Sequence, residues 1–519
     1  MSRIRHLLLA TVCAVAALPV HAQEGKRIDR LNVVLSADMR SSSPGVQRDG
    51  NSDIVLHHIV EGLVGPREDL SVAPMLAKSW TVEDGGKTYR FALRDDVVFH
   101  NGAKMTSAEV VASWKRYLDP KTQWQCLRFF DGVQGPKIEA VEAPDAQTVV
   151  FRLAQPSGLF LIGMANLQCN AAIVHGDSLG ADGAWIAPIG TGPYKLGDWQ
   201  RGRHVELDRH AAYRPLAGDK DGLVGGKHAY AEKIRFLVTP DSSVMRGALL
   251  SGDIDVNPAL APSDIDDAKK RGIQVAVQST MAWRAMLLQT QDPVLQDVRI
   301  RRAIAHAINL AEIADATSYG LAQPNPSAVP VASRFYNDKF KVWPAYDPAA
   351  AKKLLQEAGY KGQPIKIQSN MRPGGYNDIS VAMQAMMAAV GINAQIEVLD
   401  WATQLQNYLG GKFQMSSFAY SSRLDPSLGY ASVVGDKARM PSAQWDDATA
   451  RDLLDRAGKT EDQAERQKLF EELHARMAEA VPILGLYNDV MVTGAGAKVR
   501  GYRPWATGLE RYWGVWKDK

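Results

Sequence analysis

The stretch that decides the fold runs from residue 73 to residue 118 and reads APMLAKSWTVEDGGKTYRFALRDDVVFHNGAKMTSAEVVASWKRYL. Within it, Tyr89, Phe91 and Leu93 alternate with less apolar neighbours, which is the two-residue period of a half-buried strand. The dipeptide Asn101-Gly102 is typical of a tight turn, because both residues tolerate positive φ. We therefore expect a strand followed by a turn in this stretch.

A helix is predicted after the turn. Thr106 and Glu109 have the spacing of a capping box, in which the hydroxyl and the carboxylate satisfy backbone N–H groups at a helix N-terminus. Apolar side chains then recur at helical spacing, at Val110, Trp114, Tyr117 and Leu118. No residue of this stretch is of a catalytic kind, so taken alone it predicts structure and no chemistry.

The order of these features is specific. An opening Pro-x-Leu-Ala-x-Ser-Trp precedes Asp-Gly-Gly, a Tyr-x-Phe-x-Leu-Arg strand, Val-x-Phe-His-Asn-Gly and a helix that begins with Thr-Ser-Ala-Glu-Val. This order resembles the signature of family 5 extracellular solute-binding proteins, which are periplasmic receptors of ABC importers for peptides, nickel complexes and opines. The resemblance extends through most of the chain and includes the turn Gly190-Thr-Gly-Pro-Tyr194.

The resemblance implies an α/β, periplasmic-binding-protein-like fold with two lobes and an extra inserted domain. Of the three domains, the first would be discontinuous, and ligand would bind in the cleft between the first and third, with hinge closure around it. The implied boundaries are 23–70, 194–286 and 493–519 for the first domain, 71–193 for the second and 287–492 for the third.

The N-terminus has the pattern of a secretory signal peptide. Arg3 and Arg5 precede an apolar run over residues 7–20, and Val20-His21-Ala22 is a small-residue cleavage site. The run is too short to span a membrane, and Cys13 follows Val12, which does not fit a lipoprotein anchor. We expect residues 1–22 to be removed and the rest to be exported to the periplasm.

Composition and cysteine content agree with export. The formal charge is +3, and it becomes +1 without a signal that holds two arginines and no acidic residue, which argues against nucleic-acid binding. Cys126 and Cys169 remain after cleavage. In an oxidising compartment the favoured interpretation is one disulfide, and the alternative is two buried thiols.

The rest of the chain alternates short strands with helices, and one β-α-β unit favours a parallel sheet. The predicted strands lie at residues 31–35, 148–153, 171–174, 195–199, 205–207, 234–238, 283–289, 365–368 and 395–399. The predicted helices lie at residues 54–63, 246–250, 298–314 and 379–390, after Asp347-Pro348, and after a capping box formed by Thr460 and Gln463.

Enzyme and metal motifs give one alternative. Gly176-Asp-Ser178-Leu-Gly180 matches the nucleophile elbow of serine hydrolases, which requires a strand before the serine and a helix after it. Residues 171–174 could be the strand, but loop-forming residues follow. No phosphate-binding loop and no His-Glu-x-x-His motif occurs in the sequence, and the adjacent His57 and His58 cannot share a helix face as a metal pair. No cofactor or resident metal is implied.

Two ligand-binding residues follow from the peptide-binding branch of the family. Arg372, in Asn370-Met-Arg372-Pro, occupies the position of an arginine that holds the peptide carboxylate, and a guanidinium fork suits that role. Trp401, after Asp400, matches a pocket-wall tryptophan. From the residues alone, Arg372 could equally be a solvated loop residue and Trp401 a core residue at a strand end.

A third position departs from the peptide-receptor pattern. The segment Ser421-Ser422-Arg423-Leu424-Asp425-Pro426 keeps the final Asp425-Pro426, but Ser422 replaces the aspartate that neutralises a peptide's α-ammonium group, and Arg423 adds a cation. This departure favours an anionic, N-blocked or opine-like ligand over an ordinary dipeptide. Trp124 also replaces the usual small residue of its loop and either faces the ligand or is buried.

We therefore predict a non-enzymatic, monomeric receptor that captures a peptide-like or opine-like solute and delivers it to ABC permease subunits in the inner membrane. Predicted ligand-binding residues are Arg372, Trp401, Ser422, Arg423 and Asp425. The alternatives are a secreted serine hydrolase that uses Ser178 and a periplasmic chaperone, which would expose an apolar groove.

Overall fold

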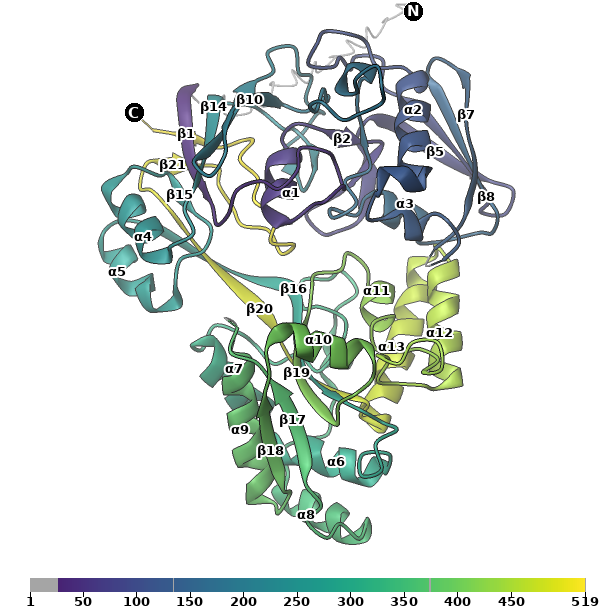
Figure 1. Cartoon of the computed structure of the whole chain (residues 1–519), viewed down its shortest axis with the longest axis vertical. Helices are drawn as coiled ribbons and strands as arrows, with labels where there is room; N and C mark the ends of the chain where they lie inside the picture. The colour runs from purple at the N-terminus through teal and green to yellow at the C-terminus, as the bar shows by residue number, and fades with distance from the viewer. Residues whose placement is uncertain (1–26, 134, 373–374, 519) are drawn as a thin grey trace, which may run out of the picture.

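The computed structural model describes residues 27–133, 135–372 and 375–518, so the predicted signal peptide lies outside the described residues. The chain forms two lobes joined by two long strands, β16 and β20 (Figure 1). The mixed α/β architecture confirms the predicted fold class. The upper lobe in Figure 1 contains the N-terminal half of the chain and the C-terminal segment, and the lower lobe contains the segment between β16 and β20.

A ten-stranded sheet extends through both lobes. Its parallel pairs include β1 with β14 and β17 with β18, and the latter confirms the parallel β-α-β unit that the sequence predicts. In sheet order the strands are β10 (Tyr194–Gln200), β11 (His204–Arg209), β14 (Ala231–Val238), β1 (Ile28–Leu35), β15 (Val256–Asn257), β20 (Ile483–Ala495), β16 (Gln274–Leu288), β19 (Met415–Tyr420), β17 (Ile365–Ser369) and β18 (Ala394–Val398).

The stretch quoted first forms much of a separate small sheet with a helix packed on it. Thr106 caps the helix and Glu109 completes the capping box, as predicted. Trp114 is fully buried against Phe130 and Phe151 and anchors the helix to the sheet. The elements are β5 (Ala77–Glu83), β6 (Thr88–Leu93), β8 (Thr148–Leu153) and β7 (Ile138–Asp145), in sheet order, with α2 (Ser107–Leu118).

Two-stranded sheets and short helices complete the upper lobe. The paired strands are β2 (Glu61–Gly62) with β9 (Ala172–Ile173), β3 (Val64–Pro66) with β4 (Val72–Pro74), β12 (Lys220–Asp221) with β13 (Val224–Gly225), and β21 (Val499–Arg500) with β22 (Trp516–Lys517). The helices are α1 (Gly50–Leu56), α3 (Phe160–Met164), α4 (Ser242–Ser251) and α5 (Ile265–Lys270), with 3₁₀ turns η1 (Pro120–Thr122), η2 (Leu127–Phe129), η3 (Gly176–Ser178) and η4 (Pro262–Asp264).

Helices cover the sheet in the lower lobe (Figure 1). Asp347 caps α8 with Pro348 in the first turn, as the sequence predicts, because its carboxylate accepts from two backbone N–H groups. The helices are α6 (Val298–Ala307), α7 (Leu310–Ser318), α8 (Pro348–Glu357), α9 (Tyr376–Ala389), α10 (Trp401–Leu409), α11 (Pro426–Tyr430), α12 (Ala448–Lys459) and α13 (Gln463–Ala480), with the 3₁₀ turn η5 (Asp338–Lys341).

Two predicted helices are wrong in their extent. The helix expected at 54–63 begins at Gly50, where Asp49 caps it, and ends at Leu56, because Glu61 and Gly62 instead pair with β9. The helix expected at 298–314 is two helices, since the side chain of Asn309 accepts from the N–H of Glu312 and begins α7.

One predicted cap is also wrong. Thr460 does not cap α13; the carboxylate of Asp462 accepts from the N–H groups of Ala464 and Glu465 and begins the helix. Thr460 instead follows the last residue of α12, and its hydroxyl group donates a hydrogen bond to Glu465. Asp is as good an N-cap as Thr and lies one residue before the helix, so local chemistry favours it.

The strands β16 and β20 connect the lobes through one continuous antiparallel ladder, from Gln274 opposite Ala495 to Leu287 opposite Ile483. At about 3.4 Å per residue, the fifteen residues of β16 reach about 50 Å. The register shifts between Ser279 and Trp283 in the middle of the ladder. Such irregularities bend a strand and increase its twist, so this point suits a hinge.

The lobes also touch at a second place, away from the ladder. The hydroxyl of Tyr89 in β6 lies 2.8 Å from a carboxylate oxygen of Glu461 in the α12–α13 connection. Beside it, a Cβ atom added to Gly158 would lie 2.4 Å from the carbonyl oxygen of Thr460. The small sheet and the end of α12 therefore approach each other backbone to backbone.

The turn at residues 190–194 packs closely on the chain after α1. A Cβ atom at Gly190 would lie 2.3 Å from the carbonyl oxygen of Ile59, and one at Gly192 would lie 2.6 Å from that of His58. The N–H of Gly192 donates to Ile59 at 2.9 Å. Glycine is thus required here by space, because any larger residue would separate β10 from the segment after α1.

We expect Gly190→Ala to destabilise the protein by about 1–3 kcal/mol, because the new methyl group overlaps a backbone carbonyl that cannot move freely. Chemical denaturation measures this change. Gly176→Ala is the matched control, since no atom lies within 4 Å of its added Cβ, and it should change stability by less than about 0.5 kcal/mol. Equal stability of the two variants would contradict the close approach.

Candidate functional site

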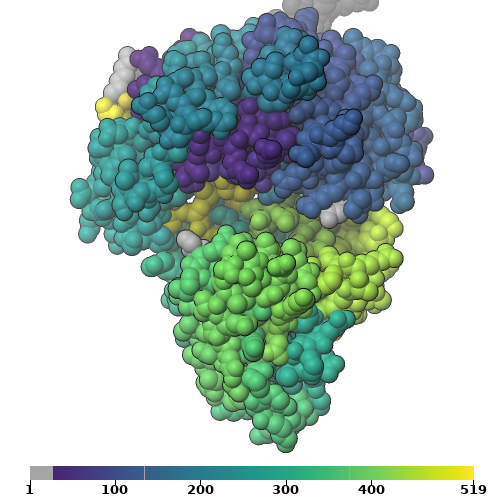
Figure 2. All heavy atoms as spheres, viewed as in Figure 1, coloured from purple at the N-terminus to yellow at the C-terminus, as the bar shows by residue number. Residues whose placement is uncertain are grey.

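The largest cavity described lies between the lobes and has a volume of about 890 Å³. Figure 2 shows the surface hollowed where the upper and lower lobes meet. The start of α1 and residues 507–509 form part of the upper wall, and the end of α10 and the loop after β19 form the lower wall. Residues 125–129 and 166–168 add a third wall from beside the small sheet.

Positive charge predominates on the walls of this cavity. Arg48, Arg128 and Arg423 line it, and Asp53 is the one acidic side chain among the described lining residues. Arg48 pairs with Asp53 and donates a hydrogen bond to it. Burial nevertheless raises the pKa of Asp53 to about 6, more than Arg48 offsets. The remaining arginines, Arg128 and Arg423, have no carboxylate within 4.0 Å in the described part of the chain.

The loop after β19 carries two of the predicted residues into the cavity. Ser422 and Arg423 both line it and are half-buried. The Arg423 guanidinium lies 3.2 Å from the carbonyl oxygen of Ser422, and burial, followed by the positive charge of Arg128, lowers the pKa of Arg423. Arg423 therefore faces the cavity as an uncompensated cation.

Asp425 anchors this loop from beneath. Its carboxylate accepts from the N–H of Ser427 at 2.9 Å, which caps α11, and pairs with Arg466 of α13 at 2.6 Å. Both side chains of the pair are at most 4% exposed. The predicted ligand-binding residue Asp425 thus lies outside the lining of the cavity, with its carboxylate engaged by the protein.

Arg372 and Trp401 lie together beside a second cavity of about 480 Å³. The Arg372 guanidinium stands 4.4 Å from the centre of the Trp401 indole ring, a cation–π geometry, and Arg372 is exposed. Arg372 lines this second cavity, and the two cavities share no lining residue. The structure therefore brings Ser422 next to Arg423, and Arg372 next to Trp401. Arg372 lines a different cavity from Ser422 and Arg423, and Trp401 is not among the described lining residues of either.

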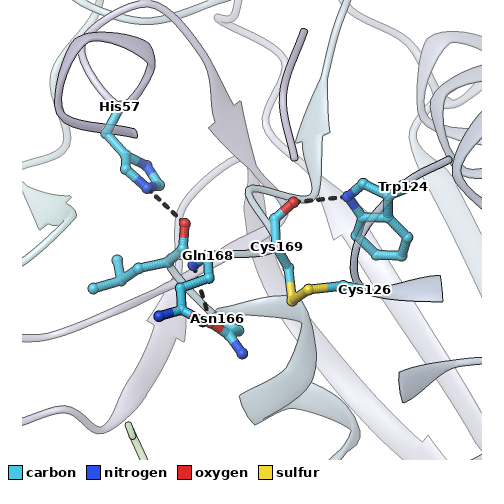
Figure 3. The surroundings of a disulfide bond; sticks show 7 residues. His57, Trp124, Cys126, Asn166, Gln168 and Cys169 are labelled. Atoms are coloured by element: carbon cyan, nitrogen blue, oxygen red, sulfur yellow. Dashed lines mark hydrogen bonds between the residues drawn. A yellow bond between two sulfur atoms is a disulfide. The ribbon is translucent and has the colours of Figure 1, made fainter. Parts of the chain in front are cut away.

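The wall beside the small sheet is held by a disulfide. Cys126 and Cys169 are bonded, which confirms the prediction (Figure 3). The indole N–H of Trp124 donates to the carbonyl oxygen of Cys169 at 2.8 Å, and His57 Nε2 donates to the carbonyl oxygen of Leu167 at 3.0 Å. Two loops that are distant in sequence are thereby fixed together as one wall.

These contacts and the burial of the side chains give Trp124, His57 and His58 structural roles. Trp124 is buried in the core under the small sheet and does not line the cavity. Burial lowers the pKa of His57 to about 4 and of His58 to about 3, so both rings are neutral at neutral pH. Within the described residues, no group of three or more His, Cys, Asp or Glu side chains is placed to hold a metal ion.

Sequence reasoning missed Arg48, Asp53 and Arg128. Arg128 could have been noticed in the sequence, because it lies two residues after Cys126 and the predicted disulfide would fix its loop. No pattern in the sequence singles out Arg48 and Asp53, which come from the start of α1 and meet the other walls only in three dimensions.

The structure contradicts the nucleophile-elbow interpretation of Ser178. This serine ends the 3₁₀ turn η3, with no helix after it, and its side chain is fully buried. Its hydroxyl oxygen accepts from the N–H of Ile189 at 3.0 Å. His175 is turned to Asp177, whose N–H it accepts, so no triad forms at Ser178. The interlobe cavity combines four charged side chains with apolar ones such as Phe129, Leu409 and Leu509, so the chaperone alternative stays a prediction.

A two-lobed fold with a cavity between the lobes is the architecture of a solute-binding protein. A family profile described as bacterial extracellular solute-binding proteins, family 5 middle, matches residues 71–442, and the chain belongs to this family. It is therefore a solute-binding protein of an ABC importer for peptides or related ligands. In the part of the chain that the structure covers, no helix is long and apolar enough to cross a membrane.

Known relatives cover nearly the whole chain. The dipeptide-binding protein of Escherichia coli K12 is 27% identical over 485 residues, which are 88% of this chain and 88% of the relative. The solved structure of HbpA2 from Haemophilus parasuis has a TM-score of 0.83 at 23% identity and covers 95% of this chain and all of its own. AgaA of A. tumefaciens R10, solved with agropinic acid, has a TM-score of 0.72 at 25% identity and covers 94% of this chain and 99% of its own.

We expect Arg466→Met to destabilise the protein by about 3–5 kcal/mol, because it leaves the buried Asp425 carboxylate without its partner. Thermal or chemical unfolding measures the loss. Lys459→Met is the matched control: it removes an ion pair with Asp455 whose side chains are more than half exposed, worth about 0–1 kcal/mol. A similar loss for both variants would show that Arg466 does not anchor the loop.

Proposed function

We propose that this protein is the periplasmic receptor of an ABC importer for a peptide-like or opine-like solute that is anionic or N-blocked. The observation that carries the proposal is the interlobe cavity, in which two arginines face the ligand space without carboxylate partners. Such cations favour a ligand that brings its own negative charge. Interdomain clefts of this size are the usual sites of small-molecule recognition.

The relatives support the same range of ligands. The E. coli relative is a dipeptide-binding protein, and AgaA was solved with agropinic acid. Export to the periplasm agrees with the predicted signal peptide at residues 1–22 and with the disulfide, which is stable in an oxidising compartment. In this proposal the receptor is a monomer and delivers the bound solute to the permease subunits in the membrane.

We propose the domain boundaries that the sequence implies, 23–70, 194–286 and 493–519 for the first domain, 71–193 for the second and 287–492 for the third. The hydrophobic cores support this division, because one gathers under the small sheet and two others gather in the lower lobe. The buried C-terminal aromatics Trp505 and Trp513 pack with Leu70 and Met281 in the upper lobe. Each domain can thus move as a unit around β16 and β20.

Ser422 is the proposed contact to the blocked amino end of the ligand, and Arg423 and Arg372, which stands beside Trp401, are the proposed contacts to its anionic group. Arg372 lies in the connection between β17 and α9 and contacts Trp401, the first residue of α10. The last residues of α10, Tyr408 and Leu409, line the large cavity. Closure of the lobes would join the two cavities around one ligand. Asp425 contributes by holding the loop of Ser422 and Arg423 in place.

Ser422→Asp should move ligand preference towards peptides with a free α-ammonium group, because the new carboxylate supplies the ion pair that serine lacks. Calorimetry with a free dipeptide and its N-acetylated form measures the preference. The exposed Ser36→Asp, which adds the same charge outside the cavity, is the control. A wild type that already prefers the free dipeptide would contradict the proposed ligand class.

Arg372→Ala should weaken binding of the N-acetylated dipeptide by roughly ten- to a hundredfold, since a hydrogen bond to a charged group contributes about 1.5–3 kcal/mol. The exposed Arg40→Ala, which lies outside both cavities, controls for the loss of one positive charge. Unchanged affinity in Arg372→Ala would remove this residue from the site and leave the family assignment intact.

A further inference from the structure

We propose that Arg128 and Arg423 form an electrostatic gate: their like charges hold the cleft open, and a carboxylate of the ligand between them allows it to close. The inference rests on the proposed function and deepens it. It makes Arg128 a ligand-binding residue. It also requires that the ligand be negatively charged, as well as of the right shape, for the lobes to close.

The two cations stand on different walls of the same cavity. Arg128 belongs to η2, beside the small sheet of the upper lobe, and Arg423 belongs to the loop after β19 in the lower lobe. Neither has a carboxylate within 4.0 Å in the described part of the chain. The one acidic side chain among the described lining residues, Asp53, is already paired with Arg48.

Both arginines line the same cavity, so their charges face one shared space. Burial is the larger cause of the lowered pKa of Arg423, and the positive charge of Arg128 is the next. Coulomb repulsion rises as the distance falls and as water leaves the space between the charges. Any motion that brings the lobes together across this cavity therefore increases the repulsion.

Neither arginine can relieve the repulsion by moving its loop. The residue before η2 is Cys126, whose bond to Cys169 fixes the Arg128 wall, and Trp124 holds the same wall through the carbonyl group of Cys169. The Arg423 loop is held by the buried pair of Asp425 with Arg466. With both loops held, the charges can be separated only by rotation of the two side chains or by a change in the angle between the lobes.

A ligand carboxylate reverses the sign of this interaction. Its two oxygens accept hydrogen bonds from guanidinium groups in a planar, bidentate geometry, and one carboxylate between two guanidinium groups attracts both. A ligand of the same shape without the negative charge would leave the two cations facing each other. The gate thus predicts that a neutral analogue fails to close the protein.

The first test uses the ligand-free protein and small-angle X-ray scattering. In Arg128→Gln, Arg423→Gln and the double variant, we expect a smaller radius of gyration than in wild type, since the repulsion is gone. Arg40→Gln, which removes an exposed cation away from the cavity, should leave the radius unchanged. Melting temperatures should rise or stay equal where the unpaired, half-buried charge of Arg423 is removed, and should stay equal in Arg128→Gln, because Arg128 is exposed. A radius equal to wild type in the double variant overturns the gate.

The second test separates the gate from the proposed ligand class. The probes are an N-acetylated dipeptide and the same molecule with its carboxylate converted to an amide. For wild type, the acid should reduce the radius of gyration and bind roughly ten- to a hundredfold more tightly than the amide. In the double variant this preference should be lost. Failure of wild type to bind the acid counts against the proposed ligand, whereas binding and closure with both probes alike overturns the gate.

Discussion

The structure depends on the backbone pairing of β16 with β20. This ladder is the one continuous element that both lobes share in the large sheet, and β15 and β19 extend it at its two ends. Hydrogen bonds along a ladder do not permit sliding without being broken, but a bulge permits bending. The register shifts near Trp283, and Arg284 pairs with Asp489 across the two strands at the same point.

The charges of the molecule divide into two kinds. Buried ion pairs such as Asp425 with Arg466 and Glu61 with Lys227 are fully enclosed and fix the loops on which they lie. In the interlobe cavity Arg423 is half-buried and Arg128 is exposed, and neither has a carboxylate within 4.0 Å in the described structure. Because burying an unpaired charge is costly, a protein keeps such groups where a partner of opposite charge arrives from outside. The unpaired arginines on the walls of the interlobe cavity therefore support its assignment as the site, because a ligand can reach them there.

The sequence predicted most of the local structure and little of the site. The capping box at Thr106 and the β-α-β unit follow from local chemistry, so they could be predicted. The break at Asn309 was missed because the apolar period continues across it, although Asn309 and Glu312 have the spacing of a helix N-terminus. The walls of the cavity come from segments far apart in the chain, and Arg128 meets Arg423 only after the lobes pack. Asp425 matched a family position, but its pairing with Arg466 depends on where α13 lies.

The contact between Tyr89 and Glu461, with Gly158 against Thr460, has a kinematic consequence. Two rigid bodies attached at one point retain three rotations, whereas two separated attachments leave one, about the line that joins them. The ladder of β16 with β20 and this second contact are two such attachments. As long as both persist, rotation about the line that joins them is the motion that disturbs them least, and the packing of Leu424 against the upper lobe changes with that angle.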